Sequence, residues 1–218
     1  MEEIAIKQKI KWGRHHQEYG FWHDYFPDKP AKLKEAYDWF MVVRNPYGRL
    51  ISEYNWININ EKRSIREKPK EEVVNDFNKF LGDKVRIIAD NKQLRDPLRK
   101  GHFNKQCCYL DNSTNITVLK FENIDVEFNM LMKIYNLNLI LDMHKNKTTS
   151  ELTIKDINNS NLALINEVYK DDFATFGYKK IVSLEEYDVS EFSPLPEFAL
   201  KNVKSVYDLE QSLVKNEN

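Results

Sequence analysis

The sequence has few cysteines, few glycines and no long apolar run. Its 218 residues include two cysteines, and these are neighbours, Cys107 and Cys108. A disulfide between adjacent residues is strained, so we expect a reduced pair and not a disulfide-stapled secreted fold. No apolar run reaches the ~18 residues that a membrane helix needs, and no apolar signal segment opens the chain. We therefore expect a cytoplasmic protein without a membrane partner.

The sequence also lacks an excess of charge of one sign. Its formal net charge is -1, which argues against a protein that coats nucleic acid. The six glycines form no Walker phosphate loop, and neither Cys/His metal-ligand spacing nor a G-x-S-x-G nucleophile motif occurs. We expect no metal site. Charged residues make up 31% and apolar residues 41%, the balance of a soluble globular domain.

Hydrophobic periodicity and turn residues predict strands that alternate with helices. Strands are expected at residues 38–43 and 116–121. Helices are expected at residues 46–59, 71–81 (closed by Gly82), 124–136, 161–174 and 197–214. This order predicts an α/β fold with a parallel sheet flanked by helices, although two strands are few for such a sheet. We expect one domain over residues 1–180, followed at 181–218 by an acidic connector and a C-terminal helix that packs on it.

The stretch WFMVVRNPYGRLISEYNW, residues 39–56, joins the first predicted strand to the next helix. Asn45 suits the N-cap of that helix, with proline at the first helical position. In open α/β sheets ligands bind beyond the carboxyl ends of the strands, and a helix N-terminus attracts anions. Arg44 could contact two oxygens of a phosphate there, and Ser52 could donate to a third. The alternative is that Arg44 pairs with a carboxylate and Ser52 faces solvent.

The same stretch resembles the 3′-phosphate-binding motif of the sulfotransferases that use 3′-phosphoadenylyl sulfate (PAPS). That motif, V-R-N-P-x-x-R-x-x-S-x-Y, matches residues 43–54. Three more segments resemble the family in the right order: His-x-x-x-Gln at 102–106, VLKFENI at 118–124, and YKDDFATFGY at 169–178. The last is similar to the Y-x-x-D-F-x-x-F-G-Y ending of the carbohydrate branch. The resemblance implies a P-loop NTPase-like sulfotransferase fold.

The resemblance also implies roles for individual residues. Arg44 and Ser52 would hold the 3′-phosphate of PAPS, the co-substrate, and Arg49 on the same helix face would contribute to the nucleotide site. His102 and Gln106 would contact the acceptor, a hydroxyl-bearing small molecule or a glycan.

A histidine pair upstream of the motif provides a candidate catalytic base. His15 and His16 lie where related carbohydrate sulfotransferases carry an active-site histidine, and the sequence does not separate the two. The alternative is that both are surface histidines in a basic segment.

The sequence departs from the family at its start. A sulfotransferase normally opens with a strand and a P-x-K-T-G-G-T/S loop that binds the 5′-phosphosulfate, and none of the six glycines heads such a loop. We expect either that the chain is a shortened form or that it is a divergent relative, and we favour the first. The first strand of the sheet would then be missing or altered. A Golgi location would follow if a membrane anchor precedes this chain.

These features predict a sulfotransferase that moves a sulfuryl group from PAPS to a hydroxyl, on a carbohydrate. The alternative is a catalytically inactive sulfotransferase-like protein that binds a 3′-phosphonucleotide or serves as an interaction module. A P-loop nucleotide kinase is disfavoured because no Walker lysine exists.

Overall fold

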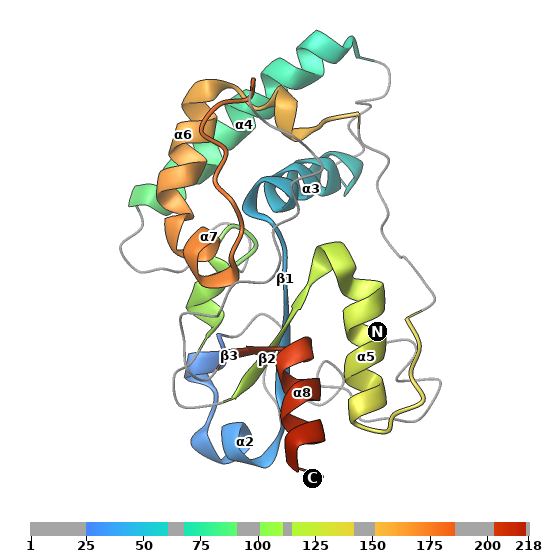
Figure 1. Cartoon of the computed structure of the whole chain (residues 1–218). Coiled ribbons are helices and arrows are strands. Elements are labelled where there is room, and N and C mark those ends of the chain that lie inside the picture. The colour runs from blue at the N-terminus through green and yellow to red at the C-terminus, as the bar shows by residue number, and fades with distance from the viewer. Residues whose placement is uncertain are drawn as a thin grey trace. The chain divides into compact units, whose positions relative to one another are not determined.

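The computed structural model describes residues 25–60, 68–90, 101–110, 115–141, 151–185 and 203–216. The chain divides into two compact units, each built from separate stretches of sequence (Figure 1). The sheet unit comprises Met1–Val43, Cys108–Lys145 and Glu197–Asn218. The helical unit comprises Arg44–Cys107 and Asn146–Pro196. The domain boundary expected at residue 180 stays a prediction.

The sheet unit is built on three parallel strands. They are β1 (Trp39–Val43), β2 (Ile116–Lys120) and β3 (Val203–Ser205), in the order β1-β2-β3. Val43 pairs with Lys120 at the carboxyl end of β1. The predicted α/β class, with a small parallel sheet flanked by helices, is confirmed. The third strand was not predicted, because three residues are too few to show a period of two.

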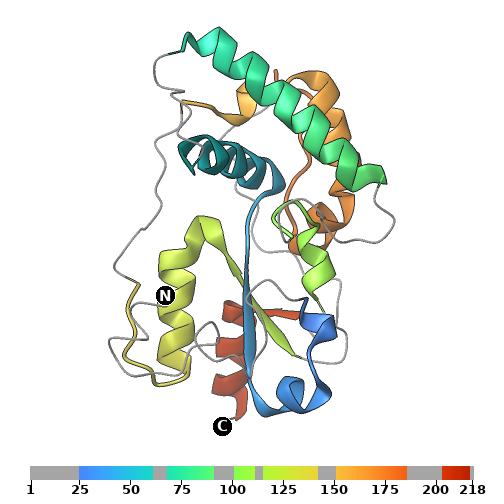
Figure 2. The same cartoon turned by 180° about the vertical axis from the view of Figure 1, so that it is seen from behind.

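Helices α5 (Ile124–Ile134) and α8 (Val206–Asn216) pack beside β2 (Figures 1 and 2). The core between them contains Leu119, Phe128 and Val206, all fully buried. Helix α8 was expected to begin at residue 197. It begins at Val206 because Ser205 and Asp208 form a reciprocal cap, in which each side chain accepts the backbone N–H of the other. The unit also contains α2 (Ala31–Ala36) and the turns η3 (Phe26–Asp28) and η6 (Phe121–Asn123).

The helical unit contains α3 (Pro46–Asn60), α4 (Lys70–Asp90), α6 (Asn159–Val168), α7 (Lys170–Phe176) and the turn η7 (Ile154–Asp156). The turn η5 (Gln106–Tyr109) begins in this unit. Helices α4 and α6 lie side by side (Figures 1 and 2). Tyr54 of α3 packs on Phe77 of α4, with ring centroids 5.2 Å apart. Aromatic contacts of this kind bury large apolar areas and account for much of the core.

Two predicted helix boundaries in this unit are wrong. The helix expected to stop at Gly82 continues to Asp90, because Gly82 serves a close helix contact and not a C-cap: a Cβ there would lie 3.3 Å from Asn161 Oδ1. The helix expected at 161–174 is two helices, α6 and α7, divided at Tyr169. Gly177, with φ of 62°, ends α7 in the left-handed conformation that favours glycine.

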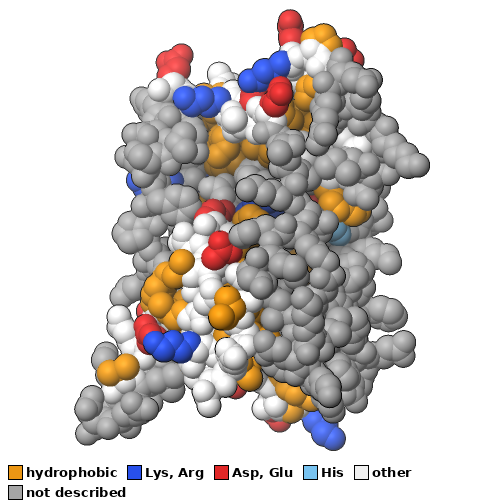
Figure 3. Space-filling model, turned by 90° about the vertical axis from the view of Figure 1, so that its right-hand side faces the viewer, with side chains coloured by type: hydrophobic (Ala, Val, Ile, Leu, Met, Phe, Trp, Pro, Cys, Tyr) orange, Lys and Arg blue, Asp and Glu red, His pale blue; other side chains and the backbone are white. Residues whose placement is uncertain are grey.

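Some hydrophobic side chains remain at the surface. Val126 and Ile140 are each more than half exposed, and Figure 3 shows hydrophobic side chains among polar ones on the face that it presents. Single exposed apolar residues are normal in globular proteins. Within the part of the chain that the structure describes, no helix has the length and apolar character to cross a membrane.

Candidate functional site

The first turn of α3 is capped as its sequence predicts. Asn45 Oδ1 accepts the backbone N–H of Tyr47 at 3.0 Å, and the Asn45 carbonyl accepts the N–H of Arg49 at 2.9 Å. Pro46 takes the first helical position, where no N–H is needed. The helix therefore starts immediately after Arg44, with the positive end of its dipole at that point.

The Arg44 side chain lies against this first turn. A Cβ placed on Gly48 would be 3.5 Å from Arg44 Nε and 3.9 Å from Nη2. Since Gly48 has no side chain, the guanidinium has room beside the helix N-terminus. A fixed positive charge and a helix N-terminus at one place are well suited to bind a phosphate.

Gln106 holds the backbone of Arg44. Gln106 Oε1 accepts the N–H of Arg44 at 2.8 Å, and Gln106 Nε2 donates to the Arg44 carbonyl at 2.7 Å. The Gln106 side chain is buried, so these bonds are shielded from water. Gln106 therefore positions Arg44, and its expected contact with the acceptor stays a prediction.

Asp172 in turn holds Gln106. Its carboxylate accepts the backbone N–H groups of Gln106 at 2.9 Å and Cys107 at 2.8 Å, and it is fully buried in the first turn of α7. One chain of hydrogen bonds thus joins Asp172 to Gln106 and Gln106 to Arg44. The structure brings together three of the four sequence motifs through this chain. Asp172 itself was not singled out from the sequence; its position in the YKDDFATFGY motif was the available signal.

Arg49 contacts protein groups. Its Nη2 donates to the Asn104 carbonyl at 2.6 Å, and its guanidinium lies 5.4 Å from the centroid of the Tyr169 ring. These contacts connect α3 to the loop before η5 and to the start of α7. The expected contribution of Arg49 to the nucleotide site stays a prediction.

Ser52 lies in α3 beyond its first turn, and His102 lies in the loop before η5, where it contacts Glu53 of α3. Ser52 is half-buried, and its hydroxyl has no hydrogen-bond partner among the described residues. His102 Nδ1 lies 3.0 Å from Glu53 Oε1, and the rings of His102 and Trp56 are 6.0 Å apart. Nothing in the sequence marked Glu53. His15 and His16, the expected catalytic pair, lie outside the described residues.

The fourth motif, VLKFENI, lies in the sheet unit, and its Lys120 is hydrogen-bonded to the buried Glu127 of α5. Glu127 Oε2 accepts the backbone N–H of Lys120 at 2.6 Å, and both side chains are almost fully buried. Burial lowers the pKa of Lys120 and raises the pKa of Glu127, because each charged form loses water. This pair closes the turn that follows β2.

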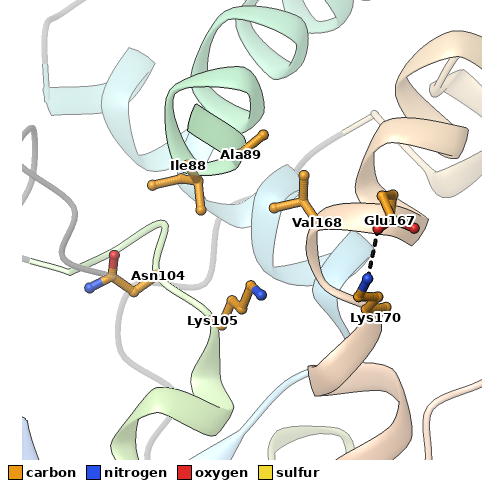
Figure 4. Close-up of a pocket in the computed structure, with 7 residues that line it drawn as sticks. All are labelled: Ile88, Ala89, Asn104, Lys105, Glu167, Val168 and Lys170. Carbon is orange, nitrogen blue, oxygen red and sulfur yellow. Dashed lines mark hydrogen bonds and ion pairs between the residues drawn. The ribbon is translucent and has the colours of Figure 1, made fainter. Parts of the chain in front are cut away.

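A cavity of about 210 Å³ lies in the helical unit, and Asn104 and Lys105 of the segment before η5 are among the residues that line it (Figure 4). Ile88, Ala89 and Val168 supply apolar walls, and an ion pair between Lys170 and Glu167 at 2.8 Å lies beside them. None of Arg44, Ser52 and His102 lines this cavity. Among the side chains that the structure describes, no three of His, Cys, Asp or Glu gather as metal ligands.

Comparison with known proteins gives one match. Residues 5–179 match the model of a family described as the sulfotransferase family, which is more than half of the chain. No curated protein matches the sequence, and no solved structure matches it.

Proposed function

The chain belongs to the sulfotransferase family, and we propose that it transfers a sulfuryl group from PAPS to a hydroxyl of a carbohydrate acceptor. The observation that carries the proposal is the position of Arg44. Its guanidinium lies against the first turn of α3, and its backbone is held by both ends of the Gln106 amide. Because the backbone of Arg44 is held in place at a helix N-terminus, less entropy is lost when its guanidinium binds a phosphate.

The residues of this site fit the 3′-phosphate of PAPS. The guanidinium of Arg44 can form two parallel bonds to phosphate oxygens, and the dipole of α3 adds a favourable field. Ser52, seven residues after the N-cap, has a hydroxyl that can donate to a further oxygen. These residues would bind and orient the donor and would not themselves take part in the covalent step.

The proposed reaction is an in-line attack of the acceptor hydroxyl on sulfur. Like phosphoryl transfer, it depends on positioning and on electrostatic stabilisation of the leaving oxygen. The base that takes the hydroxyl proton would be His15 or His16. The acceptor would be a hydroxyl-bearing small molecule or glycan, and we expect the reaction to take place in the cytoplasm without nucleic acid or membrane as a partner.

The nucleotide site is tested by thermal unfolding with 3′,5′-bisphosphoadenosine, the product of the proposed reaction. At 100 times its dissociation constant this ligand adds about 2.7 kcal/mol to the free energy of unfolding. For a chain of this length we expect Tm to rise by about 5–10 °C. The shift should disappear in Arg44→Ala and persist in Arg86→Ala, which removes an exposed arginine of α4.

The outcomes separate the proposed activity from its alternatives. No shift in the native chain would contradict the nucleotide site. A shift that survives Arg44→Ala would place the nucleotide elsewhere. Binding without any transfer of ³⁵S from labelled PAPS would favour an inactive, nucleotide-binding relative.

A further inference from the structure

Two adjacent thiols lie in the turn η5, directly beside the hydrogen bonds that support Arg44. Cys107 and Cys108 are the two cysteines of the sequence, both are reduced, and each residue is partly exposed to solvent. The proposed transfer uses neither thiol. Exposure is one condition for oxidation of a thiol, and two neighbouring thiols can be oxidised together to one disulfide.

The backbone at the first of these cysteines is fixed by Asp172. Its carboxylate accepts the N–H of Cys107 at 2.8 Å and the N–H of Gln106 at 2.9 Å. Asp172 is fully buried, and a densely packed core leaves its carboxylate little room to follow a movement of η5. Both cysteines also take part in further interactions, so the reduced pair has a defined place in the fold.

A disulfide between the two cysteines does not fit the backbone of η5 as it stands. The peptide bond between them is trans, and across a trans peptide consecutive Cα atoms are about 3.8 Å apart. Disulfides usually join residues whose Cα atoms are about 4.4–6.8 Å apart. The S–S bond therefore requires rotation of the peptide units around the pair, which turns the N–H groups of Cys107 and Gln106 away from Asp172.

Gln106 transmits such a rotation to Arg44. Its side-chain amide binds the N–H and the carbonyl of Arg44 at 2.8 Å and 2.7 Å. When the backbone of Gln106 turns, this amide moves away from both groups. Arg44 then loses the support that holds its backbone at the start of α3, so more entropy is lost when its guanidinium binds a phosphate.

We infer that Cys107 and Cys108 are a modification site, a thiol–disulfide switch whose oxidised form weakens the nucleotide site. The effect on the nucleotide rests on the proposed function, whereas the disulfide and its effect on η5 do not. The oxidant is a low-molecular-weight disulfide.

The oxidation is two successive thiol–disulfide exchanges. The thiolate of one cysteine attacks a sulfur of the small disulfide, which forms a mixed disulfide and releases one small thiol. The thiolate of the neighbouring cysteine then attacks the mixed disulfide, which forms the bond between Cys107 and Cys108 and releases a second small thiol. Two cysteine thiols are oxidised and one small disulfide is reduced, and the two cysteine protons are balanced by those of the two released thiols.

The strain in this disulfide makes the switch reversible, because strained disulfides are the more easily reduced ones. Thiol state and nucleotide binding are then linked, and each changes the other by the same factor. If oxidation weakens nucleotide binding about 10-fold, bound nucleotide makes the pair about 10-fold harder to oxidise.

The experiment equilibrates the full chain in buffers of increasing ratio of oxidised to reduced glutathione, with and without 3′,5′-bisphosphoadenosine. Mass spectrometry after blocking of the remaining thiols measures oxidation. We expect the peptide that contains both cysteines to lose two hydrogens and to regain them with dithiothreitol. Oxidation should lower the Tm of the nucleotide-free chain and remove most of the nucleotide-dependent Tm shift. The nucleotide should raise the glutathione ratio at half oxidation about 10-fold.

Cys108→Ser is the matched control, since it keeps the backbone N–H of Cys107 and cannot form the disulfide. It should retain its nucleotide-dependent Tm shift in the oxidising buffer. Loss of the shift there would assign the effect to a mixed disulfide and overturn the inference. For the native chain, addition of one glutathione, a covalent dimer or no oxidation would each overturn it. So would a disulfide between the two cysteines that changes neither the Tm nor the nucleotide-dependent shift.

Failure of the proposed function gives a different result. A reduced native chain without a nucleotide-dependent Tm shift would contradict the nucleotide site. The switch is then judged by the nucleotide-free Tm, where a fall on oxidation supports it and an unchanged value overturns it. If Cys108→Ser fails to fold, dithiothreitol treatment of the oxidised native chain decides: recovery of the original Tm supports the switch, and a permanent loss overturns it.

Discussion

Gln106 binds both backbone polar groups of Arg44, accepting its N–H at 2.8 Å and donating to its carbonyl at 2.7 Å. The amide thus fixes the peptide unit from which the guanidinium extends. Because Asp172 holds Gln106 by its backbone, the direction of Arg44 depends on a carboxylate 66 residues further along the chain from Gln106. A motif that looks local in the sequence is supported by residues that are remote in it.

Replacing Gln106 by leucine should destabilise the helical unit and weaken nucleotide binding together. Leucine has a similar size but leaves the N–H and carbonyl of Arg44 without these partners, which we expect to lower the free energy of unfolding by about 1–3 kcal/mol. Urea unfolding measures the loss, and the Tm shift with 3′,5′-bisphosphoadenosine measures binding. Gln211→Leu, at an exposed position of α8, is the control, and equal effects of the two substitutions would refute the positioning role.

Asp172→Asn should be far more harmful than Asp171→Asn. The buried Asp172 carboxylate accepts two backbone N–H groups, whereas an asparagine has one oxygen and would direct its NH₂ at the second. We expect a loss of about 2–4 kcal/mol. Asp171 pairs with Lys105 near the surface, and its substitution should cost less than about 1 kcal/mol. Both residues lie in the first turn of α7, so the helix dipole does not distinguish them.

Substitutions of Gly48 should separate helix stability from nucleotide binding. A Cβ at this position makes ordinary contact with Arg44 Nε at 3.5 Å, so Gly48→Ala should be accommodated and should stabilise α3 by about 1 kcal/mol. Gly48→Leu places further atoms where the guanidinium lies. It should therefore fold with near-native Tm and lose most of the nucleotide-dependent shift. A full shift in Gly48→Leu would show that Arg44 does not need this position.

Arg49→Lys should act mainly on stability. A lysine has one compact ammonium in place of the planar group that donates to the Asn104 carbonyl and lies over the Tyr169 ring. We expect the free energy of unfolding to fall by about 1–2 kcal/mol, with a smaller loss of nucleotide-dependent Tm shift than in Arg44→Lys. Equal losses of that shift in the two variants would assign Arg49 to the phosphate as well.

The stability of the sheet unit should depend on pH through Glu127. Burial raises the pKa of Glu127, so the folded state favours its protonated form. The stability that this group contributes is present below its unfolded pKa and is lost as pH rises through the raised folded value. Glu127→Gln keeps an oxygen for the Lys120 N–H but does not ionise, so it should gain stability relative to the native chain as pH increases.

Urea unfolding from pH 4 to pH 7 measures this gain. Glu210→Gln, on the exposed face of α8, supplies the baseline. Parallel stability curves for the native chain and Glu127→Gln would rule out a titration of Glu127 in this range.

Features that depend on near neighbours in the chain were predictable. The buried strand that ends at Val43, the Asn45 cap and the helix from Pro46 follow from periodicity and from hydrogen bonds that close within four residues. The candidate phosphate-binding residues could be named for the same reason, because Arg44 and Ser52 are close in sequence. Their role in phosphate binding stays a prediction, but it could be proposed before any fold was known.

Features that depend on contacts between residues far apart in the chain could not be predicted from the sequence. Gln106 is 62 residues from Arg44. Neither segment contains a pattern that predicts a hydrogen bond between the Gln106 side-chain amide and the Arg44 backbone. In the sequence Gly82 resembles a helix C-cap, but in the structure it lies close to Asn161 of α6. The three residues of β3 form a strand because they pair with β2. Glu53 became notable once His102 lay beside it. Local sequence decides which segments coil or extend, whereas long-range hydrogen bonds and packing decide which side chains hold the site and which face it.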